Sequence, residues 1–144
     1  MTHAATATDV SVTRGWVRGV RDGKIVLGLP NTEYELCLMM GGHGGPGTGG
    51  QAASGSTAGI IRAQALRVDI VQTGGRFIEP IYGRPRHVQG AIIDTDPAAN
   101  TITVACAPEC AIVCELASAQ NAAEFPIGSL VACDVKPGAT FEPV

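Results

Sequence analysis

The feature that most constrains the fold is a stretch of sequence that occurs twice and ends both halves of the chain. Residues 71–81 read Val-Gln-Thr-Gly-Gly-Arg-Phe-Ile-Glu-Pro-Ile, and residues 135–144 read Val-Lys-Pro-Gly-Ala-Thr-Phe-Glu-Pro-Val. The two align when one residue is dropped before the glutamate, which places Phe77 on Phe141. A repeat at this spacing indicates one structural unit that is written twice.

The sequence upstream of this stretch repeats as well. Residues 15–30 align with residues 90–108, because each has a glycine, a β-rich run, a polar turn, an alternating apolar strand and a proline. After the proline, residues 34–38 align with residues 112–116. The spacing drifts by a few residues in the turns, where insertions are tolerated. We therefore expect two related β units.

Each unit contains five short strands by its pattern of alternating apolar residues and turn residues. The link between the third and fourth strands is a glycine-rich insert, residues 41–59, in the first unit, and residues 117–124, which suit one or two helical turns, in the second. This order of elements resembles the OB-fold, and the SH3-like barrel is the alternative. The resemblance extends to no specific family. The sequence thus predicts an all-β fold of two tandem five-stranded OB-like barrels that arose by internal duplication.

The expected domain boundaries follow from this repeat. They are a flexible tail at 1–9, a first unit at 10–83, a linker at 84–87 and a second unit at 88–144. Roughly 60 to 75 residues per unit is near the lower limit for an independent core. The two units should therefore pack on each other or on neighbouring copies.

Charge divides unequally between the two halves. Residues 1–86 hold nine Lys/Arg and six Asp/Glu, hence +3, whereas residues 87–144 hold one Lys and seven Asp/Glu, hence −6. The sum is the overall −3. Opposite charge on two copies of one unit favours head-to-tail attraction between chains, although drift of solvated faces gives the same pattern. No membrane-spanning run and no signal-peptide pattern is present, and the five cysteines have no disulfide-scaffold spacing, so we expect a cytoplasmic protein.

The residues expected at a ligand site or interface are Arg14, Trp16, Arg18 and Arg76. The first three share one face of a predicted strand by its period of two. Binding of single-stranded nucleic acid needs a basic groove with aromatic platforms, and only Trp16 between its two arginines resembles one. Because the second unit is acidic, the sequence disfavours nucleic acid as a partner.

The cysteines suggest a metal site only weakly. Cys106, Cys110 and Cys114, together with Cys133, would supply four thiolates for zinc or an iron–sulfur cluster. Their spacing fits no strong template, and the repeat aligns two of them with leucines, Cys106 with Leu29 and Cys114 with Leu36. We therefore expect buried small hydrophobic side chains and no cofactor.

No combination of residues predicts catalysis. The glycine-rich insert lacks the lysine of a phosphate-binding loop, and Asp94 and Asp96 suit a hairpin turn. We expect a non-enzymatic structural protein that self-associates into a ring, shell or filament; the alternative is an OB-type binding module for single-stranded nucleic acid or another anionic ligand. The contact would join a basic surface of one copy to an acidic surface of another. The basic side would comprise Arg14, Arg18, Arg62, Arg67 and Arg76, and the acidic side Asp94, Asp96, Glu109, Glu115 and Asp134.

Overall fold

The computed structural model describes residues 11–41 and 55–144, so the predicted tail at 1–9 and most of the glycine-rich insert lie outside the described residues. The fold is all-β and contains a closed five-stranded barrel with additional strands. The described residues form β1 (Val12–Arg21), β2 (Lys24–Gly28), β3 (Glu35–Met40), β4 (Gly55–Ile70), β5 (Phe77–Glu79), β6 (Tyr82–Gly83), β7 (His87–Asp96), β8 (Thr101–Ala107), β9 (Cys110–Glu115), a 3-10 turn η2 (Ala122–Glu124), β10 (Leu130–Val135) and β11 (Thr140–Pro143). None of the helical segments in these two ranges is long and apolar enough to cross a membrane.

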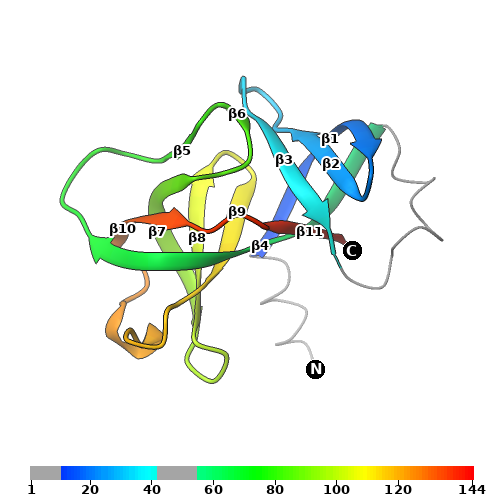
Figure 1. The fold of residues 1–144 in the computed structure, drawn as a ribbon. Coiled ribbons are helices and arrows are strands. Elements are labelled where there is room, and N and C mark those ends of the chain that lie inside the picture. Colours follow the sequence, from blue (N-terminus) through cyan, green and yellow to red (C-terminus); the bar gives the residue numbers. More distant parts are fainter. Residues whose placement is uncertain (1–10, 42–54) are drawn as a thin grey trace.

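The long strand β4 organises the molecule. Its first part pairs with β1 and β11, its middle with β9 and its last part with β10. The strand pairings therefore form two closed rings of strands, and β4 belongs to both rings. The first ring consists of β1, β2, β3, β11 and β4; the second ring consists of β4, β10, β7, β8 and β9. In Figure 1, β4 runs across the molecule from the first ring to the second.

The three-stranded meanders of the two rings follow the same plan. In each meander consecutive strands pair antiparallel, β1–β2–β3 in one ring and β7–β8–β9 in the other. The register shifts at a bulge between Val17 and Gly19 in the first meander and between Ile92 and Asp94 in the second. Each bulge begins two residues after a glycine, Gly15 or Gly90, and these two glycines are aligned in the sequence repeat.

Those two glycines have the same structural role. A Cβ atom on Gly15 would lie 2.6 Å from the carbonyl oxygen of Gly28 on β2. A Cβ atom on Gly90 would meet the carbonyl group of Ala105 on β8, 2.7 Å from its carbon. Close approach of neighbouring strands at the start of each bulge therefore requires glycine.

The two copies of the segment that repeats most closely in sequence, around Phe77 and Phe141, do not occupy equivalent places in the fold. Phe77 lies on β5, which pairs with β7 of the second ring, whereas Phe141 lies on β11, which pairs with β3 and β4 of the first ring. Phe141 is fully buried, and Phe77 is half-buried with its ring stacked on His87 at a centroid distance of 5.7 Å. The two ranges 10–83 and 88–144 thus exchange strands, and neither closes its ring from its own residues.

Two further details of the sequence analysis are corrected. Residues 55–59, predicted as part of the insert, belong to β4. The absence of a side chain at Gly59 makes this pairing possible, since a Cβ atom there would lie 2.5 Å from the Phe141 ring and 2.6 Å from the Glu142 carbonyl oxygen. The third-strand alignment is also shifted by two residues. Register pairs Ile25 with Leu38 and Ile102 with Cys114, so Cys114 occupies the place of Leu38 rather than Leu36.

One hydrophobic cluster fills both rings. Its largest fully buried side chains are Phe141, Ile25, Leu27, Leu36, Leu38, Ile61, Ile78, Ile92, Ile102, Ile112, Val68 and Val88. A buried threonine joins the rings where they meet. Thr13 of β1 donates a hydrogen bond from Oγ1 to the Ala111 carbonyl (2.8 Å) and accepts one from the Ala111 N–H (3.0 Å). Because every buried side-chain polar atom of the described residues has a hydrogen-bond partner, the junction carries no cost of an unpaired polar group.

Candidate interaction surfaces

The outer side of β1 carries the basic and aromatic residues that the sequence placed together. Arg14, Trp16 and Arg18 are exposed, while the residues between them, from Thr13 to Val17, alternate to the inside. Trp16 keeps 46% of its surface exposed. Among the described residues no carboxylate pairs with Arg14, and β1 presents this cation next to an aromatic side chain.

Strand register extends this surface into a row across four strands. Trp16 pairs with Gly28, Gly28 with Glu35, and Glu35 with Tyr82 of β6. Residues directly opposite each other in a sheet point to the same side. Trp16 and Tyr82 therefore face the same way at the two ends of the row, which we call the aromatic row. Tyr82 is 66% exposed.

Arg18 lies across the middle of the aromatic row. Its Nε atom would be 2.9 Å from a Cβ on Gly28, so the missing side chain of Gly28 makes room for the arginine. The same Nε lies 3.6 Å from Oε2 of Glu35. The guanidinium is thus held between the two aromatic side chains, with 58% of the Arg18 side chain exposed.

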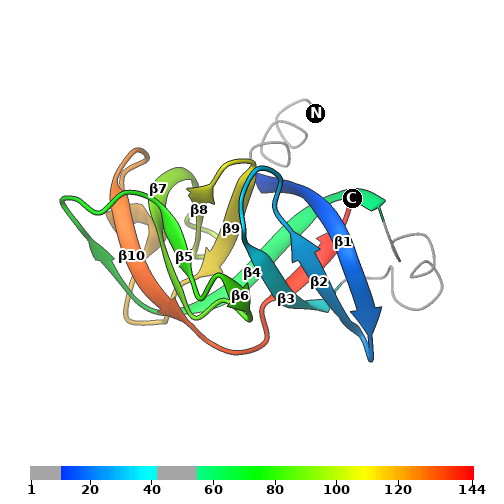
Figure 2. The same ribbon diagram turned by 90° about the horizontal axis from the view of Figure 1, so that it is seen from above.

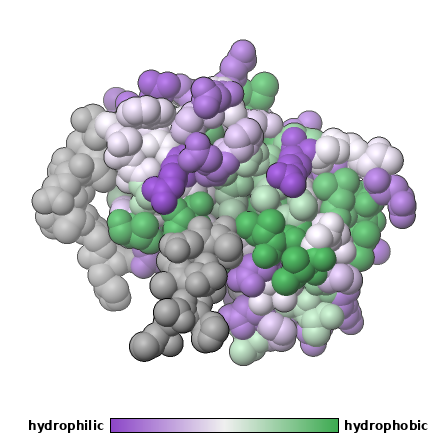
Figure 3. Space-filling model, turned by 180° about the vertical axis from the view of Figure 1, so that it is seen from behind, coloured by the Kyte–Doolittle hydropathy of each residue, from purple (hydrophilic) through white to green (hydrophobic). Residues whose placement is uncertain are grey.

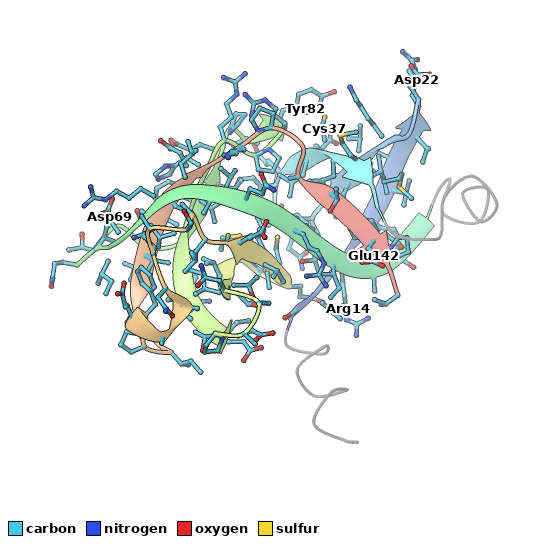
Figure 4. All side chains as sticks on the ribbon, turned by 60° about the horizontal axis from the view of Figure 1, so that its bottom comes forward. Arg14, Asp22, Cys37, Asp69, Tyr82 and Glu142 are labelled. Atoms are coloured by element: carbon cyan, nitrogen blue, oxygen red, sulfur yellow. The ribbon has the colours of Figure 1, made fainter. Side chains whose placement is uncertain are left out.

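Sequence reasoning missed Tyr82, and one of the residues that it named, Arg76, lies elsewhere on the surface. Tyr82 reaches the row only because the two-residue strand β6 pairs in parallel with β3, and Figure 4 shows it near Cys37 of that strand. No local sequence pattern predicts a strand pairing of only two residues. Arg76 is exposed, but it precedes β5, which pairs with β7 of the second ring, and so it lies outside the row.

A polar groove lies where the second ring meets β4. It consists of two adjoining hollows of about 540 Å³ and 430 Å³ that share Arg62, Thr101 and Val113. We call it the inter-ring groove. Its remaining wall residues include Ala63, Gln64, Glu115, Pro137 and Thr140 in the larger hollow and Ser11, Ile60, Asp94, Asp96, Thr103 and Glu142 in the smaller.

Carboxylates dominate the charge of the inter-ring groove. Four acidic residues face one arginine, Arg62, whose Nε lies 3.9 Å from Oε1 of Glu142. Glu115 accepts a hydrogen bond of 3.3 Å from Nε2 of Gln64. Arg62 was expected on a basic surface, but β4 carries it into the acidic groove. Arg67, another of those expected cations, forms an ion pair with Asp69 at 3.0 Å.

Asp96 has the turn role that its sequence context predicted. Its Oδ1 accepts hydrogen bonds from the backbone N–H groups of Ala98 (3.1 Å) and Ala99 (3.2 Å), which closes the β7–β8 turn. Asp94 lines the groove two residues earlier. The remaining carboxylates of the groove are therefore the ones available to a partner.

The four cysteines considered as metal ligands lie buried in the core of the second ring. The Cys106 thiol hydrogen-bonds with Cys110, and that bond together with burial raises the pKa of Cys106. A hydrogen bond to Cys133, together with burial, raises the pKa of Cys114, and the same bond lowers the pKa of Cys133. In the described part of the chain no three His, Cys, Asp or Glu side chains are grouped so that they could hold a metal ion, and all five cysteines are unpaired.

Large exposed hydrophobic side chains are spread over the surface. Figure 3 shows them on one face as separate groups with hydrophilic side chains between. The most exposed are Val144, Tyr82, Ile127, Ile81, Ile70, Leu66, Trp16, Met39 and Val20. Comparison of the chain with protein-family models, with curated proteins and with solved structures found no match.

Proposed function

We propose that this protein is a non-enzymatic assembly protein that self-associates head to tail into a ring, shell or filament. One observation carries the proposal: the first-ring meander carries an excess of exposed cations, although Asp22, Glu33 and Glu35 lie among them, and the inter-ring groove carries an excess of carboxylates around Arg62. The meander of the first ring bears exposed Arg14, Arg18, Arg21 and Lys24, and the inter-ring groove bears the carboxylates. Contact between unlike surfaces repeats from copy to copy and closes into a ring or continues as a filament.

Charge would orient such a contact rather than supply its affinity. An exposed ion pair contributes about 0.2–1 kcal/mol, so a few pairs give at most modest binding. Burial of apolar surface contributes about 25 cal/mol per Å². The exposed Val20, Met39 and Trp16 on the first ring provide such surface beside the cations.

Light scattering on a size-exclusion column tests the proposal. We expect species larger than a monomer at high micromolar concentration, and slower assembly as salt rises, because screening weakens the orienting charges. A strict monomer at every concentration and salt would contradict the proposal.

The aromatic row supports a second function, the binding of an anionic chain such as single-stranded nucleic acid. Three strand spacings of about 4.8 Å separate Trp16 from Tyr82, or about 14 Å, and Arg18 lies between them. Two stacking platforms with a cation between them suit a chain of bases.

The fluorescence of Trp16, the one tryptophan of the chain, reports directly on this second function. Titration with a thymidine oligonucleotide at low salt should quench the emission, and Tyr82→Ala should weaken the binding by about 1–3 kcal/mol, the value of one stacked base. Ile127→Ala is the matched control, since Ile127 is equally exposed (64%) but lies outside the row. An unchanged emission leaves self-association as the only candidate.

We also propose that the two rings are OB-like units derived by internal duplication, despite the exchange of strands between them. The shared bulge and the paired glycines support this origin. So do two hydrogen bonds, from Met40 N–H to Gly23 O (2.8 Å) and from Leu116 N–H to Asn100 O (3.0 Å), which close each meander at the same place. The assembly would form in the cytoplasm, where unpaired thiols such as these five are maintained.

A further inference from the structure

The β1–β2 hairpin ends in a basic tip, residues 20–24, that extends away from the rest of the fold (Figure 2). Arg21 pairs with Lys24, and the two residues between them have positive φ, 52° at Asp22 and 76° at Gly23. This two-residue turn matches the twist of the strands, so the tip is rigid. All five residues are exposed, and Val20 keeps 42% of its surface free.

The tip complements the inter-ring groove in charge and in shape. The hairpin tip presents two cations and one carboxylate next to an apolar side chain, Val20. The groove presents Glu115, Glu142 and Asp94 around an apolar wall that includes Val113. A narrow projection of one copy thus meets a concave surface of opposite charge on another.

The tip cannot fill the groove of its own chain. Val12, at the start of β1, pairs with Ile60 of β4, which lines the groove. From Val12 to Arg21 the strand advances nine residues, or about 30 Å at 3.3 Å per residue. A tip can therefore enter only the groove of another molecule.

We propose that the β1–β2 tip of one copy docks in the inter-ring groove of the next copy, with Arg21 and Lys24 against Glu115 and Glu142. This inference rests on the proposed self-association and names its two surfaces. Because tip and groove are different surfaces of each copy, the contact is heterologous and leaves one free tip and one free groove on every growing chain of copies.

Charge reversal on each side tests the contact. Arg21→Glu with Lys24→Glu, the tip variant, and Glu115→Lys with Glu142→Lys, the groove variant, should each lower the association constant at least tenfold. A chain that carries all four substitutions should associate again, because the charges are exchanged. Matched controls change the same net charge elsewhere on the surface: Arg84→Glu with Arg86→Glu for the tip, and Glu79→Lys with Glu124→Lys for the groove.

Mixing the two variants gives a sharper test. The intact tip of the groove variant fits the intact groove of the tip variant, and the reversed tip fits the reversed groove. Neither variant should therefore assemble alone, whereas an equimolar mixture should form alternating assemblies as large as those of the wild type. Circular dichroism checks that each variant is folded. If the wild-type protein is a monomer, the proposed function fails; if it assembles and the tip and groove variants assemble as well as their controls, the proposed function stands and this interface is wrong.

Discussion

The two meanders of the molecule share a backbone plan and differ in what they expose. In the first ring the outer face of the meander carries the aromatic row and four exposed cations. In the second ring β9 is buried on both faces from Cys110 to Cys114, since its outer side packs against the start of β1. One plan therefore yields an open surface in one place and a covered surface in the other.

This comparison separates the constraints on the backbone from those on the side chains. The bulge and its glycine recur because strands at that point approach too closely for any Cβ atom. The interior needs only apolar side chains of suitable total volume, so leucine in one ring is replaced by cysteine in the other. The exposed side chains, which packing constrains less, give a net charge of +3 to residues 1–86 and of −6 to residues 87–144.

The largest expected difference is between the two phenylalanines that the sequence repeat aligns. Phe141→Ala removes a fully buried phenyl group from the core of the first ring. It should lower the free energy of unfolding by about 3–5 kcal/mol. Phe77→Ala removes a half-buried ring that stacks on His87 and should cost about 1 kcal/mol. Urea unfolding followed by far-ultraviolet circular dichroism measures both. Equal losses would mean that β5 and β11 are equivalent after all.

Truncation of the side chain should also destabilise the protein by different amounts at two core positions that correspond by strand register. Leu38→Ala should destabilise the protein by about 2–5 kcal/mol, because a large side chain with 1% exposure leaves a cavity. Cys114→Ala, at the matching position, removes only one sulfur atom and should cost about 1 kcal/mol. The same unfolding experiment compares them. A larger loss for Cys114→Ala would point to a role of the thiol beyond packing.

The paired glycines offer a test of the shared plan itself. Gly15→Ala and Gly90→Ala should each destabilise the fold by about 1–3 kcal/mol, because the added methyl meets a backbone carbonyl that cannot move freely. Gly19→Ala is the control, since a Cβ there meets nothing within 4 Å, and it should change the stability by less than about 0.5 kcal/mol. If Gly90→Ala is harmless while Gly15→Ala is not, the close approach of the strands is not a shared feature.

The smallest expected effect is a loss of stability at alkaline pH that arises in the second ring. Hydrogen bonds and burial raise the pKa of Cys106 and Cys114 above the ordinary value of 9.0. Such a thiol stabilises the fold fully below its unfolded pKa, and this contribution is lost as the pH rises through the higher folded pKa. Between pH 8 and pH 10.5 the double variant Cys106→Ala, Cys114→Ala should therefore lose less stability than the wild type. An equal loss of stability in the wild type and the double variant would contradict this assignment.

The sequence was informative where local pattern and register act together. The structure confirms the all-β class, the hairpin at Asp22-Gly23 and the alignment of Gly15 with Gly90. Each of these predictions depends on the sequence pattern within a few residues of the position concerned. The shared face of Arg14, Trp16 and Arg18 follows from the period of two alone.

The partners of short strands could not be predicted. The sequences around Phe77 and Phe141 are similar, but three or four residues pair with whichever strand edge the rest of the fold leaves open. Tyr82 joins the aromatic row for the same reason, through a parallel pairing of two residues. Arg62 lies in an acidic groove because β4 is much longer than its predicted counterpart and continues into the second ring.

The exchange of strands also determines when during synthesis the protein is able to fold. The first ring lacks β11 until residues 140–143 have left the ribosome, although β1 to β4 end at residue 70. At about 5–20 residues per second, the 73 residues from 70 to 143 take roughly 4 to 15 seconds to translate. During that interval the gap between β3 and β4 leaves the core side chains Ile25, Leu27 and Leu38 accessible to water. We therefore expect the yield in cells to depend on holdase chaperones more than the stability of the finished fold suggests.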